Sequence, residues 1–137
     1  MIKTSKEIRK EIEKVLRGVL MVPSDKEWEV PLLSEVHSFA DLYAKVKRPS
    51  YAPIRFECEE FALHFLVEQR LSSLSNFNWP LGLCLATKML HGEKLKENHW
   101  LNIVYAREGV YFIEPQAVNR QVWKGSNGGD NVEFIFM

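Results

Sequence analysis

The chain has 137 residues, of which 46% are hydrophobic and 26% are charged, as is usual for a globular protein. Its 18 basic and 18 acidic side chains cancel, so nothing in the charge indicates nucleic acid or an anionic membrane as a partner. We therefore expect one domain over residues 1–137, with a helical part at residues 1–48 and a helix plus sheet at residues 49–137.

Cysteine usage and the first residues bear on where the protein works. The two cysteines, Cys58 and Cys84, are too few for a disulfide framework and predict a reducing compartment. Five of the first ten residues are charged, and these ten residues lack the apolar stretch of a signal peptide. No run approaches the ~20 apolar residues that a membrane-spanning helix needs. We expect a cytoplasmic protein.

Two helices are predicted in the first part of the chain. The sequence Thr4-Ser5-Lys6-Glu7 is typical of a capping box, and apolar residues follow it at helical spacing. This pattern predicts a helix over about residues 5–20. Residues 22–37 are expected to form an irregular connection, and Ser38 is expected to cap a second, short helix.

A third helix is predicted from Cys58 to about Ser72. Residues 49–53, which contain two prolines, should form a stiff approach to it. Taken alone, Cys58 is best explained as a buried core residue, since a free cysteine packs like a small hydrophobe. The apolar residues expected to form the buried face are Phe61, Ala62, Phe65, Leu66 and Leu71, broadened by Leu63 and Val67.

The rest of the chain is rich in strand patterns. Two aromatic and β-branched runs flank residues 107–109, where Gly109 suits the positive φ of a hairpin turn. Helices followed by antiparallel strands indicate an α+β fold, with the cysteine helix packed on the sheet. The strands are expected at residues 81–89, 100–105, 110–113, 121–123 and 132–136.

Three residues are candidates for a catalytic triad: Cys58 at a helix start, His99 at a strand start and Glu114 at a strand end. A helix N-terminus and a nearby imidazolium both favour the reactive thiolate, although acidic neighbours oppose it. The expected hairpin register places Glu114 diagonal to His99, where a carboxylate can orient an imidazole. A surface histidine and a strand-end charge are the alternative explanations.

The segments that carry these residues, Cys-Glu-Glu-Phe-Ala, Asn-His-Trp-Leu-Asn and Tyr-Phe-Ile-Glu-Pro-Gln, resemble the papain-like superfamily in its transglutaminase-like branch. They are most similar to small phage and bacterial proteins and to the cysteine-protease domain attached to some fungal lectins. The resemblance covers about residues 50–123. It implies a nucleophile at Cys58, a general base at His99 and an orienting carboxylate at Glu114.

The same resemblance suggests further site residues. Tyr51 would supply an oxyanion donor, although relatives often have Gln or Asn upstream of the cysteine. Gln116 would contact the histidine or the substrate, and Trp100 would border the cleft. Calcium near the cysteine is implied by the lectin-attached relatives, with a solvated acidic helix start as the alternative. The possible calcium ligands are Glu57, Glu59 and Glu60. No zinc-like spacing and no other cofactor signal is present.

Two functions follow as hypotheses. The first is a cysteine hydrolase or acyl transferase that acts on a peptide or amide substrate through a thioester. The second is a catalytically inactive papain-like binding module of phage or mobile-element origin, which the missing upstream Gln or Asn favours.

Overall fold

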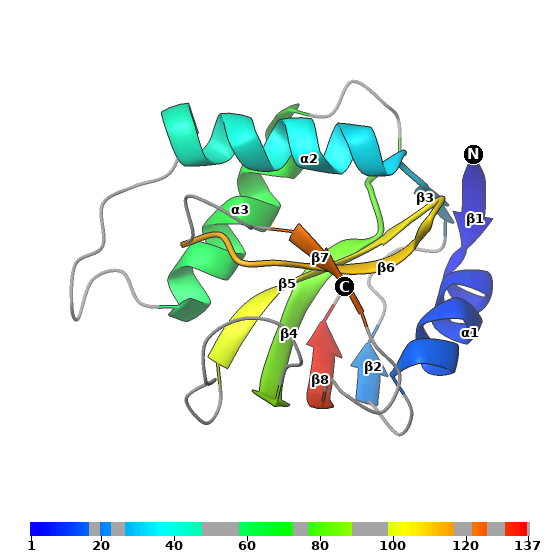
Figure 1. Cartoon of the computed structure of the whole chain (residues 1–137). Coiled ribbons are helices and arrows are strands. Elements are labelled where there is room, and N and C mark those ends of the chain that lie inside the picture. The colour runs from blue at the N-terminus through cyan, green and yellow to red at the C-terminus, as the bar shows by residue number, and fades with distance from the viewer. Residues whose placement is uncertain are drawn as a thin grey trace.

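The computed structural model describes residues 1–16, 20–22, 27–47, 58–72, 77–88, 99–116, 122–125 and 131–136. These residues form an α+β fold, as the sequence predicts, in which helices cover a six-stranded sheet (Figure 1). The helices are α1 (Ser5–Val15), α2 (Leu33–Leu42), which continues into the π-helical turn η1 (Tyr43–Lys47), and α3 (Cys58–Ser72). The strands are β1 (Ile2–Thr4), β2 (Leu20–Val22), β3 (Glu27–Glu29), β4 (Leu81–Lys88), β5 (His99–Ala106), β6 (Gly109–Ile113), β7 (Val122–Lys124) and β8 (Asn131–Phe136).

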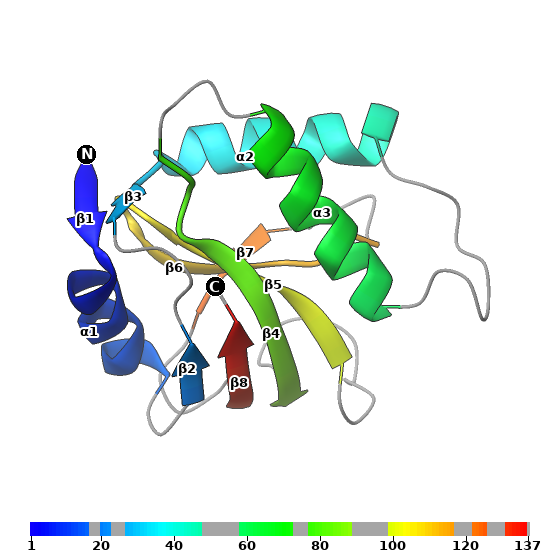
Figure 2. The same cartoon turned by 180° about the vertical axis from the view of Figure 1, so that it is seen from behind.

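The large sheet has the strand order β2-β8-β4-β5-β6-β7. Its neighbouring strands are antiparallel except for β2 and β8, which run parallel. A separate two-stranded sheet pairs β1 with β3. The two opposite views show α2 and α3 crossing over one part of the large sheet, with α1 away from them and near β2 (Figures 1 and 2).

Two clusters of buried side chains lie on the two faces of the sheet. Strand alternation explains the division, because successive side chains of a strand point to opposite faces. In β5, Leu101 and Ile103 join the cluster that includes Ile8 and Ile12 of α1. Val104 and Ala106 join the second cluster, which holds the buried side chains of α2 and α3. The helices α2 and α3 thus share one face, and α1 covers the other.

The predicted helices of the first part need correction. The first helix ends at Val15 rather than near residue 20, and Leu20–Val22 form β2 instead. Its N-terminus is as predicted, since the Thr4 side chain accepts a hydrogen bond from the Glu7 amide at 3.2 Å. The connection expected at residues 22–37 contains β3, whose Trp28 is fully buried. Residues 1–48 therefore include three short strands as well as helices.

The second helix begins at Leu33, five residues before the predicted cap at Ser38. Its start is held by carboxylates: Glu35 accepts from the Leu32 amide at 2.9 Å, and Glu108 accepts from the Leu33 amide at 2.7 Å. Glu108 belongs to the distant hairpin turn, so the contact that fixes this helix end is invisible to a local pattern. Negative charge at a helix N-terminus is favourable because it meets unpaired amides and the positive end of the helix dipole.

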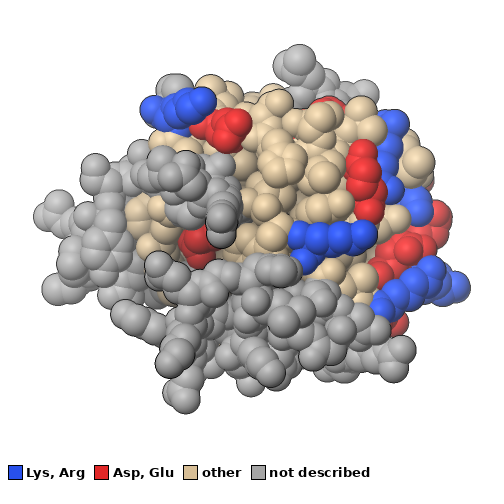
Figure 3. Space-filling view, viewed as in Figure 1, with Lys and Arg blue, Asp and Glu red and all other residues tan. Residues whose placement is uncertain are grey.

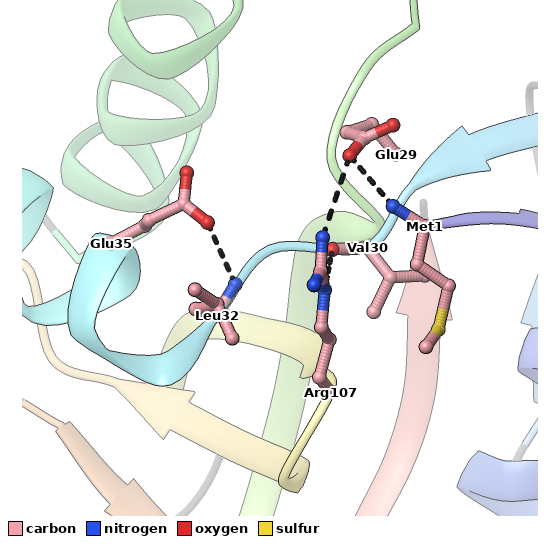
Figure 4. Close-up of polar contacts among 6 residues, drawn as sticks. All are labelled: Met1, Glu29, Val30, Leu32, Glu35 and Arg107. Atoms are coloured by element: carbon pink, nitrogen blue, oxygen red, sulfur yellow. Dashed lines mark hydrogen bonds and ion pairs between the residues drawn. The ribbon is translucent and has the colours of Figure 1, made fainter.

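A second residue of that turn ties the hairpin to β3 (Figure 4). The Arg107 Nε donates to the Val30 carbonyl at 3.2 Å, and its Nη2 lies 4.0 Å from Glu29 Oε1. The same Glu29 oxygen lies 2.9 Å from the Met1 ammonium. The turn itself is as predicted, with Gly109 at a φ of 137°.

The third helix has the predicted bounds, but its buried face is narrower than predicted. Phe61, Ala62 and Phe65 are buried. Three residues expected to broaden or extend that face are instead exposed: Leu63 is 51% exposed, Val67 is 45% and Leu71 is 77%. The sheet and α2 cover only one side of α3, so its apolar content exceeds what the fold buries.

Candidate functional site

The candidate site begins at the first turn of α3. Cys58 is the first residue of this helix, where it is half-buried and forms no disulfide. The first-turn amides of a helix lack backbone acceptors and present a positive dipole end. The helix packs on β5 and β4, which brings its start to the part of the sheet where β5 begins (Figures 1 and 2).

The β5–β6 hairpin supplies the other side of the site. Its ladder ends with the pair of Asn102 and Ile113, and Glu114 follows directly after β6. The pairing agrees with the register predicted for the hairpin, whereas the diagonal placement of Glu114 and His99 lies beyond the last pair and stays a prediction.

Polar groups gather where β6 ends. Glu114 and Gln116 are both half-buried, and the backbone amide of Gln116 donates to Glu114 Oε1 at 3.1 Å. Burial raises the pKa of the Cys84 thiol well above its usual range, and the negative charge of Glu114 raises it further. Cys84 itself is a core residue, as predicted.

The other predicted site residues are described to different extents. Trp100 is half-buried in β5. His99 is the first residue of β5 and pairs with Ala86 through its backbone, but its side chain lies outside what the structure describes. Tyr51 also lies outside the described residues. The helix that begins at Cys58 packs on β5, and Glu114 follows β6, which pairs with β5. The predicted contact between thiol and imidazole stays a prediction.

A residue to which the sequence analysis gave no role fastens α3 to the sheet. Asn102 is fully buried in β5, and its Nδ2 donates to the Ala62 carbonyl of α3 at 2.8 Å and to the Gly82 carbonyl of β4 at 3.2 Å. The signal that the sequence offers is the strand alternation. Asn102 lies two positions from Trp100 and from Val104, so its polar side chain points to the same, inward face of the strand.

A second polar link joins η1 to α3. The Tyr43 hydroxyl lies 2.9 Å from His64 Nδ1, and His64 Nε2 lies 3.6 Å from Glu68 Oε1. The Tyr43 ring is buried against Phe65, with ring centroids 4.8 Å apart. The sequence analysis assigned no role to His64, because its partner Tyr43 lies on another element.

The proposed calcium ligands are described only in part. Glu57 lies outside the described residues, as does the side chain of Glu59, and Glu60 is half-buried. Within the described ranges, no three His, Cys, Asp or Glu side chains are grouped so that they could hold a metal ion. In the same ranges no helix has the length and apolar character to cross a membrane.

Charge is mixed on the face of the molecule shown in Figure 3. Acidic and basic side chains lie next to one another there, mostly toward the side where α1 lies, and the area between them carries few charges. On this face the described residues form no large patch of one sign.

Comparison with solved structures shows that the fold is similar to that of Polyporus squamosus lectin. A structure described as the PSL1a–E64 complex matches with a TM-score of 0.67 and 18% sequence identity, over 99% of this chain and 51% of that chain. The lectin bound to the human-type influenza-binding epitope Neu5Aca2-6Galb1-4GlcNAc matches with a TM-score of 0.68 and 18% identity, over 99% of this chain and 49% of that chain.

These matches show a shared fold, and the chain spans about half the length of the lectin chains. No protein-family model matches the sequence, and no curated protein matches it.

The comparisons contradict the predicted papain-like and transglutaminase-like family. The structural neighbours are lectins, and neither is described as a papain-like hydrolase or a protease. Nothing in them supports a cysteine protease or a catalytic triad. The resemblance rested on three short segments, whereas the structural match extends over nearly the whole chain.

Proposed function

We propose that the chain is a non-catalytic module that binds a small ligand where α3 and β5 begin and β6 ends. The observation that carries the proposal is the match of 99% of the chain to a lectin described in complex with two different compounds. Because the chain spans about half of that lectin, the ligand class is part of the proposal.

The chemistry of the described residues supports this location. Small-molecule sites combine apolar or aromatic surface with a few polar groups that fix the ligand's orientation. The thiol of Cys58, the indole of Trp100, the carboxylate of Glu114 and the amide of Gln116 are all half-buried, so each retains access to solvent. We assign these four residues to the site, and we add His99 and Tyr51 from the sequence prediction.

Binding requires less of these residues than catalysis does. A thiol and a carboxylate that only contact a ligand need no matched pKa values and no proton path between them. An aromatic ring can cover the apolar face of a ligand, while the carboxylate and the amide accept or donate hydrogen bonds at its edge. The same four side chains therefore support recognition without turnover.

The test is calorimetric titration with the two compounds named for the neighbours, E64 and Neu5Aca2-6Galb1-4GlcNAc. We expect at least one of them to bind. Cys58→Ala should weaken that binding by about tenfold or more, which corresponds to about 1.4 kcal/mol. The matched control is Leu71→Ala, which changes an exposed residue at the far end of the same helix and should leave the affinity unchanged.

Two outcomes contradict the proposal. In the first, neither compound binds at millimolar concentration. In the second, a compound binds with equal affinity to the wild type and to Cys58→Ala, which would locate its site elsewhere on the molecule.

A further inference from the structure

Asn102 is a polar residue in a place where the fold would accept an apolar one. Its side chain is fully buried between α3 and the sheet, and it points to the same face of β5 as Val104 of the apolar cluster. Both hydrogens of its amide are used, one toward Ala62 and one toward Gly82. Its Oδ1 is buried and has no hydrogen-bond partner among the described residues.

That unpaired oxygen calls for an explanation. Burying an amide with one atom unsatisfied is unfavourable, and an apolar side chain of similar size avoids the desolvation. Buried polar atoms without partners are uncommon in native structures. The two donated bonds must therefore supply something that packing alone does not.

The bonds act on one particular part of the helix. Ala62 lies about one turn after Cys58, so the side-chain amide of Asn102 binds the helix where its first turn ends. Further along, Phe65 and Leu66 anchor the helix by burial. At the start, Phe61 and Ala62 are buried as well, whereas Cys58 and Glu60 are half-buried, so the hydrogen bond from Asn102 adds to the packing next to the half-buried thiol. The bond to Gly82 fixes the same amide to β4, so helix, β4 and β5 meet at a single side chain.

We propose that Asn102 is a positioning residue for the Cys58 site. It holds the first turn of α3 against β4 and β5 and so sets the place of the Cys58 thiol relative to the start of β5. The inference rests on the proposed site, and it concerns how that site is held rather than which ligand enters it.

The experiment measures Cys58 directly and needs no ligand. In a Cys84→Ala background, Cys58 is the single thiol. Its labelling rate with iodoacetamide is measured from pH 6 to 10 for the parent and for Asn102→Leu. Gln69→Leu is the matched control, because Gln69 is a buried amide of the same helix that also has an unpaired oxygen, about two turns further on.

With Asn102→Leu, the freed first turn should expose the thiol. We expect the labelling rate at high pH to rise about fivefold or more. The pH profile of the labelling rate should also differ from the parent's, because the thiol no longer keeps its place at the positive end of the helix dipole. Gln69→Leu should leave both quantities at the parent's values. Hydrogen exchange of the Phe61 and Ala62 amides should speed up in Asn102→Leu and stay unchanged in the control.

Asn102→Ser is the second variant, in case the leucine prevents folding, and it should shift the profile in the same direction. A labelling profile that coincides with the parent's in a folded Asn102 variant overturns the inference, even if that variant is less stable. The failure of E64 and of the trisaccharide to bind would instead refute the proposed function and leave this result standing.

Discussion

The two cysteines differ in environment, and the difference has a measurable consequence. Cys58 is half-buried at a helix start, whereas Cys84 is fully buried in β4 with its pKa raised well above the usual range by burial and by Glu114. A thiol with a raised pKa keeps its proton in the folded protein after the unfolded chain has lost it. Alkaline pH therefore favours the unfolded state through Cys84.

The prediction is a fall in stability above the ordinary thiol pKa of about 8.5. One such group contributes a slope of at most about 1.4 kcal/mol per pH unit. Urea unfolding under reducing conditions from pH 7 to 10 measures it. Cys84→Ala should lower stability at pH 7 through the cavity it leaves but flatten the alkaline slope. An unchanged slope in this variant would show that Cys84 is not the responsible group.

Residue-level inference from the sequence placed Cys58 at the start of a helix and Glu114 at the end of a strand, where the structure has them, while their roles in a site stay predictions. It gave no role to Asn102 and did not foresee the contact between Tyr43 and His64. Such contacts join residues 20 or more positions apart, and their partners become visible only when the elements are packed.

At the scale of the element, α3 carries apolar residues both on its buried side and on its exposed side. Phe65 is buried and packs edge to face on Phe39 and Tyr43 of the second helical segment. Leu71 is 77% exposed on the same helix. The hydrophobic pattern of the sequence does not separate these two residues, but the packing does.

We predict that Phe65→Ala destabilises the fold by about 3–5 kcal/mol, since a large buried ring is lost and a cavity remains. Leu71→Ala should change the free energy of unfolding by no more than about 0.5 kcal/mol. Denaturant unfolding of the two variants beside the wild type measures both values. Similar losses for the two substitutions would contradict the described orientation of α3.

Elements with local signals were predicted well, and those that depend on distant pairing were not. The bounds of α3 follow from helical spacing, and those of the β5–β6 hairpin follow from its strand composition and Gly109. The strand β2 was mistaken for the end of a helix, because Leu20–Val22 gain their strand partner only from β8 at the other end of the chain. The start of α2 was displaced because Glu108 of the hairpin caps it.

At the scale of the whole molecule, the large sheet pairs β2, from the first part of the chain, with β8, from its last part. This arrangement supports the proposal that residues 1–137 form one domain, because no division into residues 1–48 and 49–137 leaves the sheet intact. The match to the lectin over 99% of the chain has the same extent. The α+β class was predictable from the order of helices and strands, but the family was not, because short motifs recur on unrelated folds.

The central claim is that a ligand binds where α3 and β5 begin and β6 ends. It is tested most directly by mapping backbone amide chemical shifts of the isotope-labelled protein during titration with whichever of E64 and Neu5Aca2-6Galb1-4GlcNAc binds in calorimetry. The account predicts that the shifts gather at Cys58–Ala62, Trp100–Asn102 and Glu114–Gln116, and that they vanish in Cys58→Ala. Shifts confined to α1, β1 and β3, or no shifts at all, would contradict it.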